Sequence, residues 1–96
     1  MSYARLFVVY ARDAIAQQQI ERDLCDLKGY LTAEAGCERA EVWSQDDGLM
    51  VAMVTVWSTT GDALRFDASG LNSLLEAIAE LRTAGLPDVR LFRVVC

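Results

Sequence analysis

The protein has 96 residues, of which 53% are hydrophobic, and it carries a formal net charge of −5. We expect a single domain over residues 1–96, with part of its apolar surface covered by a second chain. The acidic charge and the lack of a Lys/Arg cluster argue against nucleic acid or an anionic membrane as a partner. No apolar run approaches the ~20 residues of a membrane-spanning helix, and residues 6–10 are too short for a signal-peptide core, so we expect a cytoplasmic protein.

The first predicted strand covers residues 5–11 and is apolar on both faces. Asp13 is a suitable N-cap for the helix that we expect over residues 14–33. Gly36 suits the left-handed position that follows a helix. The buried stripe of the helix recurs at spacings of 4, 3 and 4 residues and consists of Ile20, Leu24, Leu27 and Leu31.

Residues 37–45 form a second predicted strand in which the alternation of apolar and polar residues is incomplete. Ala40 and Val42 share one face, and the other face carries Cys37, Arg39, Glu41 and Trp43. This pattern indicates an exposed edge strand, with Trp43 at a dimer contact rather than in a ligand site. The Asp-Gly pair in the turn at residues 45–48 predicts a hairpin, so the next strand is its antiparallel neighbour.

Residues 49–58 carry no formal charge and do not alternate, which predicts a central strand covered on both faces. A buried helix would also fit this polarity, but the β-branched residues and the flanking turns favour a strand. One face carries Leu49, Val51, Met53, Thr55 and Trp57, and the other carries Met50, Ala52, Val54 and Val56. We expect the first of these sets, which is bulkier and partly polar, to face away from the helices.

A turn at residues 59–62 and one helical turn at residues 63–66 are expected next. Asp67 or Ser69 can cap a second main helix, which Gly85 and Pro87 end. The predicted buried stripe of this helix consists of Leu71, Leu74, Leu75, Ile78 and Leu81. Residues 89–96 form the last predicted strand.

The predicted order is therefore strand, helix, strand, strand, helix, strand. This is the ferredoxin-like α+β arrangement, a four-stranded antiparallel sheet with its helices on one face. Two helices cover only one face of such a sheet, yet the two central strands are apolar on both faces. The bare face must therefore meet a second sheet, a ligand, or both.

From residue 36 onward the chain resembles the antibiotic biosynthesis monooxygenase family of dimeric α+β barrel proteins. The matching stretches are Ala-Gly-Cys at residues 35–37, Glu-Val-Trp at 41–43, Thr-Val-Trp-Ser at 55–58, Ser69, and residues 89–95. The resemblance implies a homodimer in which two sheets pack into a barrel, with a ligand cleft in each protomer between sheet and helices. It also implies an oxygenase that acts on aromatic quinols without metal or flavin, and hence no cofactor.

The sequence contains no histidine, which removes Ser-His and Cys-His nucleophile pairs and the usual imidazole ligand for haem or zinc. The haem-degrading branch of the family has a histidine on the last helix. The corresponding position in this chain is near Glu76, so we do not expect haem degradation. The family's aromatic residue after the third strand corresponds to Phe66. The Asn that several family members carry on the first strand is missing, because the only Asn here is Asn72.

Three aromatic residues are candidates for contacting a small apolar or aromatic ligand. Trp57 could stack on the ligand, although a Trp at a strand end more often packs in the core. Phe66 could form a wall of the pocket, and Tyr10 could offer a hydroxyl to a bound quinol. The alternative is a dimer that binds a small ligand, or an accessory subunit, without turnover. A buried hydrogen-bonding group beside Trp57 and Phe66 would favour the enzyme, and a cleft lined only by aliphatic residues would favour the binding protein.

Overall fold

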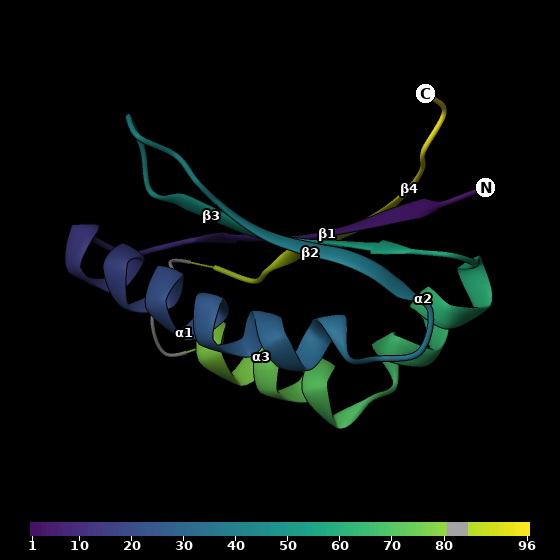
Figure 1. Ribbon diagram of the computed structural model, residues 1–96. Helices are drawn as coiled ribbons and strands as arrows, with labels where there is room; N and C mark the ends of the chain where they lie inside the picture. Colours follow the sequence, from purple (N-terminus) through teal and green to yellow (C-terminus); the bar gives the residue numbers. More distant parts are fainter. Residues whose placement is uncertain (81–84) are drawn as a thin grey trace.

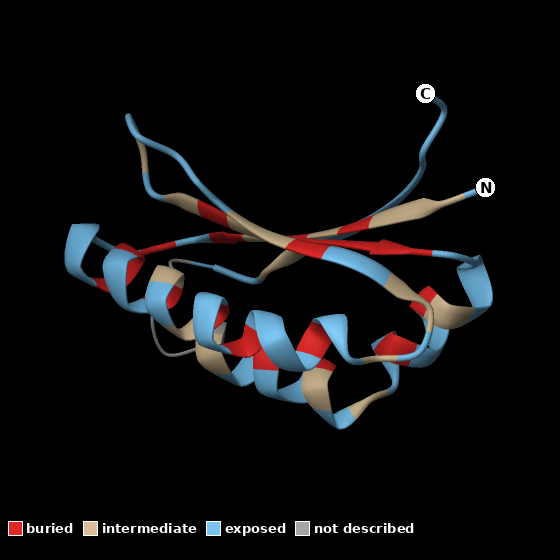
Figure 2. Cartoon of the chain, in the orientation of Figure 1, coloured by how far each residue is buried: buried red, intermediate tan, exposed pale blue. Residues whose placement is uncertain are grey.

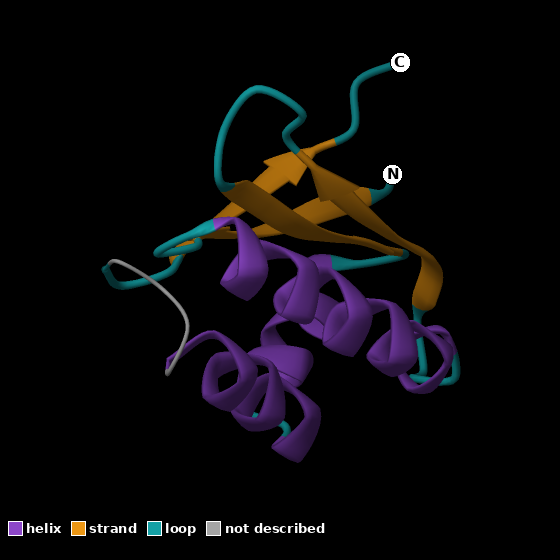
Figure 3. Ribbon diagram, turned by 90° about the vertical axis from the view of Figure 1, so that its left-hand side faces the viewer, coloured by secondary structure: helices purple, strands orange, loops and turns teal. Residues whose placement is uncertain are grey.

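The computed structural model describes residues 1–80 and 85–96, with the side chains of residues 1–78 and 85–96. Four antiparallel strands form one sheet in the order β2-β3-β1-β4, and the helices lie together on one face of it (Figures 1 and 3). The elements are β1 (Tyr3–Tyr10), α1 (Ala14–Thr32), β2 (Cys37–Ser44), β3 (Met50–Trp57), α2 (Thr60–Asp67), α3 (Gly70–Glu80) and β4 (Asp88–Arg93). The ferredoxin-like arrangement, with β1 and β3 central and β2 at an edge, is therefore confirmed.

The start and end of α1 follow the predicted signals. The Asp13 carboxylate accepts a hydrogen bond from the Ala16 N–H at 2.7 Å, which caps the helix. The predicted stripe of α1 is buried throughout. Gly36 has a φ of +84°, and a Cβ at this position would lie 2.3 Å from the Asp62 carboxyl group. Glycine therefore lets the chain turn from α1 into β2 at this point without backbone strain or a clash with Asp62.

The region after β3 is more helical than the sequence predicted. Thr59 caps α2, which has eight residues rather than one turn. Ser69 caps α3, since its Oγ accepts from the Asn72 N–H at 3.2 Å. In α3, Leu75 is fully buried, but Leu74 is 48% exposed, so its place in the buried stripe was wrong. Leu81 lies outside the described residues.

The orientation predicted for β3 was wrong. Val51, Met53, Thr55 and Trp57 are each at most 1% exposed and lie beneath the helices, on the same face as Phe7 and Val9 of β1. Trp57 can be buried there because its indole N–H donates to Thr55 Oγ1 at 2.8 Å. Figure 2 shows the buried residues of the helices concentrated on the side that faces the sheet.

The opposite face of the sheet has no helix over it in the described part of the chain (Figure 1). Val54 and Val56 lie at its centre, and Trp43 and Phe92 are half-exposed toward its edges. A β-bulge between residues 37 and 39 changes the register of β2, so Cys37 packs against the core and does not share the face of Trp43 as predicted. This second apolar face agrees with the two-sided pattern of the central strands.

Candidate functional site

A buried arginine occupies the space between the sheet and the helices. Arg5 of β1 is 4% exposed, and its position opposite Thr55 of β3 directs it to the helix face. Its Nε donates to Asp67 Oδ1 at 2.7 Å, and its Nη2 donates to Asn72 Oδ1 at 2.7 Å. A guanidinium remains charged in proteins, so this cluster brings a positive charge into the apolar interior.

Asn72 holds the guanidinium in place from α3. Its side chain is buried, and its amide nitrogen donates to the main-chain carbonyl of Asp67 at 2.9 Å. The amide orientation is therefore determined by two partners of opposite kind, a carbonyl acceptor and a guanidinium donor. Asp67 itself ends α2 and is half-exposed, with 47% of its side chain accessible to solvent.

Aromatic rings surround the charged end of Arg5. Its Cζ lies 5.0 Å from the centroid of the Phe66 ring and 6.0 Å from that of Phe7. The Phe66 ring in turn lies 5.1 Å from that of Trp57, with 35° between the ring planes. The result is an aromatic pair next to a buried cation, an arrangement in which cation–π attraction adds to the hydrogen bonds.

Two of the three predicted ligand residues come together, and the third lies elsewhere. Trp57 and Phe66 are in contact and line a pocket of about 80 Å³ with residues of the α1–β2 connection, of α2 and with Ser69. Tyr10 lies at the opposite end of β1, because Trp57 pairs with Tyr3, seven residues earlier. At ~3.3 Å per residue this separates them by about 23 Å, and Tyr10 lies on the bare face. Within one chain the three do not form a single site.

Sequence reasoning missed Arg5 and Asn72. Arg5 was assigned only to the start of the first strand. Asn72 was mentioned only because several family members carry their Asn on the first strand, where this chain has none. One signal was available, because the alternation of β1 places Arg5 on the face of Phe7 and Val9. An arginine in phase with core residues needs buried partners.

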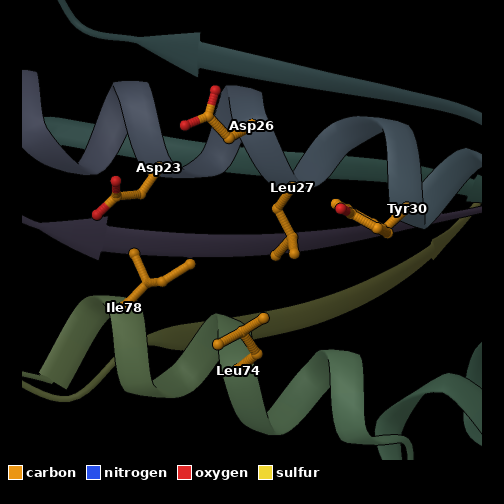
Figure 4. A pocket seen from close by; sticks show the side chains of 6 residues that line it. All are labelled: Asp23, Asp26, Leu27, Tyr30, Leu74 and Ile78. Atoms are coloured by element: carbon orange, nitrogen blue, oxygen red, sulfur yellow. The ribbon is translucent and has the colours of Figure 1, made fainter.

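A second, shallower depression lies between α1 and α3 (Figure 4). Leu27 of α1 points toward Leu74 and Ile78 of α3, while Asp26 and Tyr30 lie on the α1 side. Its volume is about 210 Å³. None of the three predicted ligand residues lines it.

The described residues do not indicate a metal site, a reactive thiol or a membrane-spanning helix. There, no group of three or more His, Cys, Asp or Glu side chains is placed to hold a metal ion. Burial raises the pKa of the Cys37 thiol, which keeps it protonated and weakly nucleophilic at neutral pH. Within residues 1–80 and 85–96, no helix has the length and apolar character needed to cross a membrane.

Solved structures with the same fold were found at low sequence identity. Rv0793 from Mycobacterium tuberculosis aligns over 100% of this chain and 97% of its own, with a TM-score of 0.84 and 14% identity. A Bordetella bronchiseptica protein, provisionally assigned as an antibiotic biosynthesis monooxygenase, aligns over 99% of this chain and 98% of its own, with a TM-score of 0.83 and 12% identity. The ActVA-Orf6 monooxygenase of Streptomyces coelicolor, solved with nanaomycin D, aligns over 99% of this chain and 88% of its own, with a TM-score of 0.81 and 16% identity.

This chain has the fold of the antibiotic biosynthesis monooxygenases. The resemblance seen in the sequence is thereby confirmed at the level of the fold. No protein-family model matches the sequence, and no curated protein does. The antibiotic biosynthesis monooxygenase fold therefore rests on structure, and the chemistry must be argued from the residues of this chain.

Proposed function

We propose that the protein is a monooxygenase that oxidises a small aromatic or quinol-type substrate without a cofactor, in the space between sheet and helices. The observation that carries the proposal is the buried guanidinium of Arg5 beside Phe66 and Trp57. A buried hydrogen-bonding group beside Trp57 and Phe66 is the feature expected of an enzyme, whereas a cleft lined only by aliphatic residues is expected of a binding protein. The likeness to the ActVA-Orf6 monooxygenase, solved with nanaomycin D, supports the same function class.

In this mechanism the substrate supplies all the electrons. A phenolic O–H is deprotonated, and the electron-rich phenolate passes one electron to dioxygen. A fixed cation in a dry, aromatic surrounding stabilises both the phenolate and the reduced oxygen, since electrostatic stabilisation is stronger where water is excluded. Arg5 would provide that charge, and Phe66 and Trp57 would orient the aromatic ring.

The overall reaction balances without any further reductant. The ring carbon para to the phenolic oxygen loses its hydrogen and gains one oxygen atom as a carbonyl. The phenolic C–O becomes the second carbonyl as its hydrogen leaves. The two hydrogens and the second oxygen atom form water, so a phenol and dioxygen give a quinone and water.

The test is dioxygen uptake with 1,8-dihydroxyanthrone as substrate, corrected for its spontaneous oxidation. We expect the wild-type protein to accelerate uptake and Arg5→Met to abolish the acceleration. Arg12→Met is the matched control, because Arg12 is an exposed arginine just after β1. Equal rates for wild type and Arg5→Met would contradict the proposed role of the guanidinium.

We further propose that the protein functions as a homodimer joined through the bare face of the sheet. That face has an apolar centre that includes Val54 and Val56, with Trp43 and Phe92 farther out.

Ion pairs lie at the two edge strands of this face, formed by Arg39 with Glu41 on β2 and by Arg90 with Asp88 on β4. An apolar centre with aromatic anchors and a charged rim is typical of protein interfaces. A Bacteroides fragilis protein described as dimeric and ferredoxin-like has the same fold, with a TM-score of 0.78 and 8% identity.

The alternative function is a dimeric protein without turnover, which either binds a small ligand or serves as an accessory subunit. The size of the pocket beside Trp57 favours the accessory subunit, because about 80 Å³ is well below the ~300 Å³ at which ligand pockets begin. The same oxygen measurement separates the two functions. Tight binding of the anthrone without accelerated uptake would support the binding protein.

A further inference from the structure

The helix face of β4 carries apolar side chains that are open to solvent. Leu91 is 43% exposed and Val89 is 45% exposed. Leu91 pairs with Arg5, and Val89 pairs with Phe7, so each lies beside a buried residue of β1 on the same face of the sheet. These two residues form an apolar strip, the β4 strip, whose Leu91 end lies beside Arg5 in the register of the sheet.

Arg5 is held by one fixed partner and one that can be exchanged. Its bond to Asn72 is buried, with Asn72 only 6% exposed, and changing it would leave polar atoms unpaired in the interior. Its other partner, the Asp67 carboxylate, is half-exposed and can be solvated by water if it leaves the guanidinium. Nη1 makes no hydrogen bond to any described residue, so it can donate to an additional oxygen ligand.

The chemistry of the present partner indicates the chemistry of the ligand. Asp67 presents a carboxylate to the guanidinium, and planar carboxylates are the groups that arginine pairs with most specifically. An aromatic ring lying on the β4 strip would place a ring carboxylate next to Arg5. The ligand would then replace one carboxylate by another, so the buried cation is never left without an anion.

We infer that the helix face of β4 beside Arg5 binds a hydroxyaromatic carboxylate, with its ring on Val89 and Leu91 and its carboxylate on Arg5 in place of Asp67. This names the substrate class for the proposed function and rests on it for the turnover of the ligand, whereas the binding itself does not. Asn72 acts as a positioning residue, since it keeps the guanidinium in place while the counterion changes.

The experiment is calorimetric titration of the full chain with two matched probes, 1-hydroxy-2-naphthoate and its neutral amide, 1-hydroxy-2-naphthamide. We expect the wild-type protein to bind the acid at least about tenfold more tightly, as charge-assisted hydrogen bonds are worth about twice neutral ones. Arg5→Met should remove that preference. Leu91→Ala should weaken both probes by a similar factor, because it removes apolar contact and no charge.

Asp67→Asn keeps the experiment decisive even if Arg5→Met does not fold. Loss of the competing carboxylate should raise the affinity for the acid severalfold and leave the affinity for the amide unchanged. Asp46→Asn is the control for long-range charge, because Asp46 is an exposed acid in the β2–β3 turn. A purely structural Asp67 would leave the affinity for the acid unchanged or lower it.

Equal affinity for acid and amide, or no binding of either, would overturn the inference. Oxygen uptake with the neutral anthrone would in that case still support the monooxygenase. Conversely, selective binding of the acid without any oxygen uptake would support the inferred ligand class and contradict the proposed enzyme.

Discussion

The buried amide of Asn72 provides the sharpest stability test of the Arg5 cluster. Asn72→Ala removes the acceptor for Arg5 Nη2 and the donor to the Asp67 carbonyl, at distances of 2.7 and 2.9 Å. The guanidinium keeps its bond to Asp67 but loses its buried partner. Because the site is only 6% exposed, water cannot readily replace what is lost.

The magnitude follows from the two hydrogen bonds. A hydrogen bond to a charged group contributes about 1.5–3 kcal/mol and a neutral one about 0.5–1.5 kcal/mol. The higher helix propensity of alanine returns up to about 0.7 kcal/mol. We therefore expect Asn72→Ala to lower the free energy of unfolding by about 1.5–4 kcal/mol, and the melting temperature by about 4–8 °C for each kcal/mol.

The assay is urea unfolding followed by circular dichroism, with all variants at one protein concentration because a dimer makes stability depend on concentration. Ser73→Ala is the control, since Ser73 is the next residue of α3 and is exposed. We expect it to change the free energy of unfolding by less than about 0.5 kcal/mol. Equal stability of the two variants would refute the view that Asn72 supports a buried charge.

Two further pairs of substitutions test the fold. Met53→Asp puts a charge into the core and should prevent folding, whereas Phe92→Asp, on the bare face where Phe92 is 51% exposed, should give a folded monomer by light scattering; a folded Phe92→Asp dimer would contradict the proposed interface. Gly36→Ala should lower the free energy of unfolding by more than about 1 kcal/mol, because φ is +84° and the new Cβ would meet Asp62. Gly29→Ala, in the last turn of α1 with nothing within 4 Å of a Cβ, should raise it by up to about 1 kcal/mol; equal effects at the two glycines would show that left-handed geometry is not what Gly36 provides.

Local signals were sufficient for the four strands, the two main helices and their order, whereas α2 was predicted only as one helical turn. The hydrophobic period of α1, the Asp13 cap and the turn at Asp47-Gly48 depend on neighbours in the chain, so they can be read without the fold. The apolar character of both faces of residues 49–58 correctly indicated a central strand. Even the uncovered face could be inferred, because the ferredoxin-like arrangement places its helices on one face of the sheet.

The direction of each face, by contrast, was decided by tertiary packing. A strand that is apolar on both sides has no signal for which side meets the helices, and here the Trp57 side does. Arg5 and Asn72 are 67 residues apart, and only the packing of α3 against β1 brings them together. A buried charge takes its partners from distant elements, so the polar cluster of the candidate site became visible only in the tertiary structure.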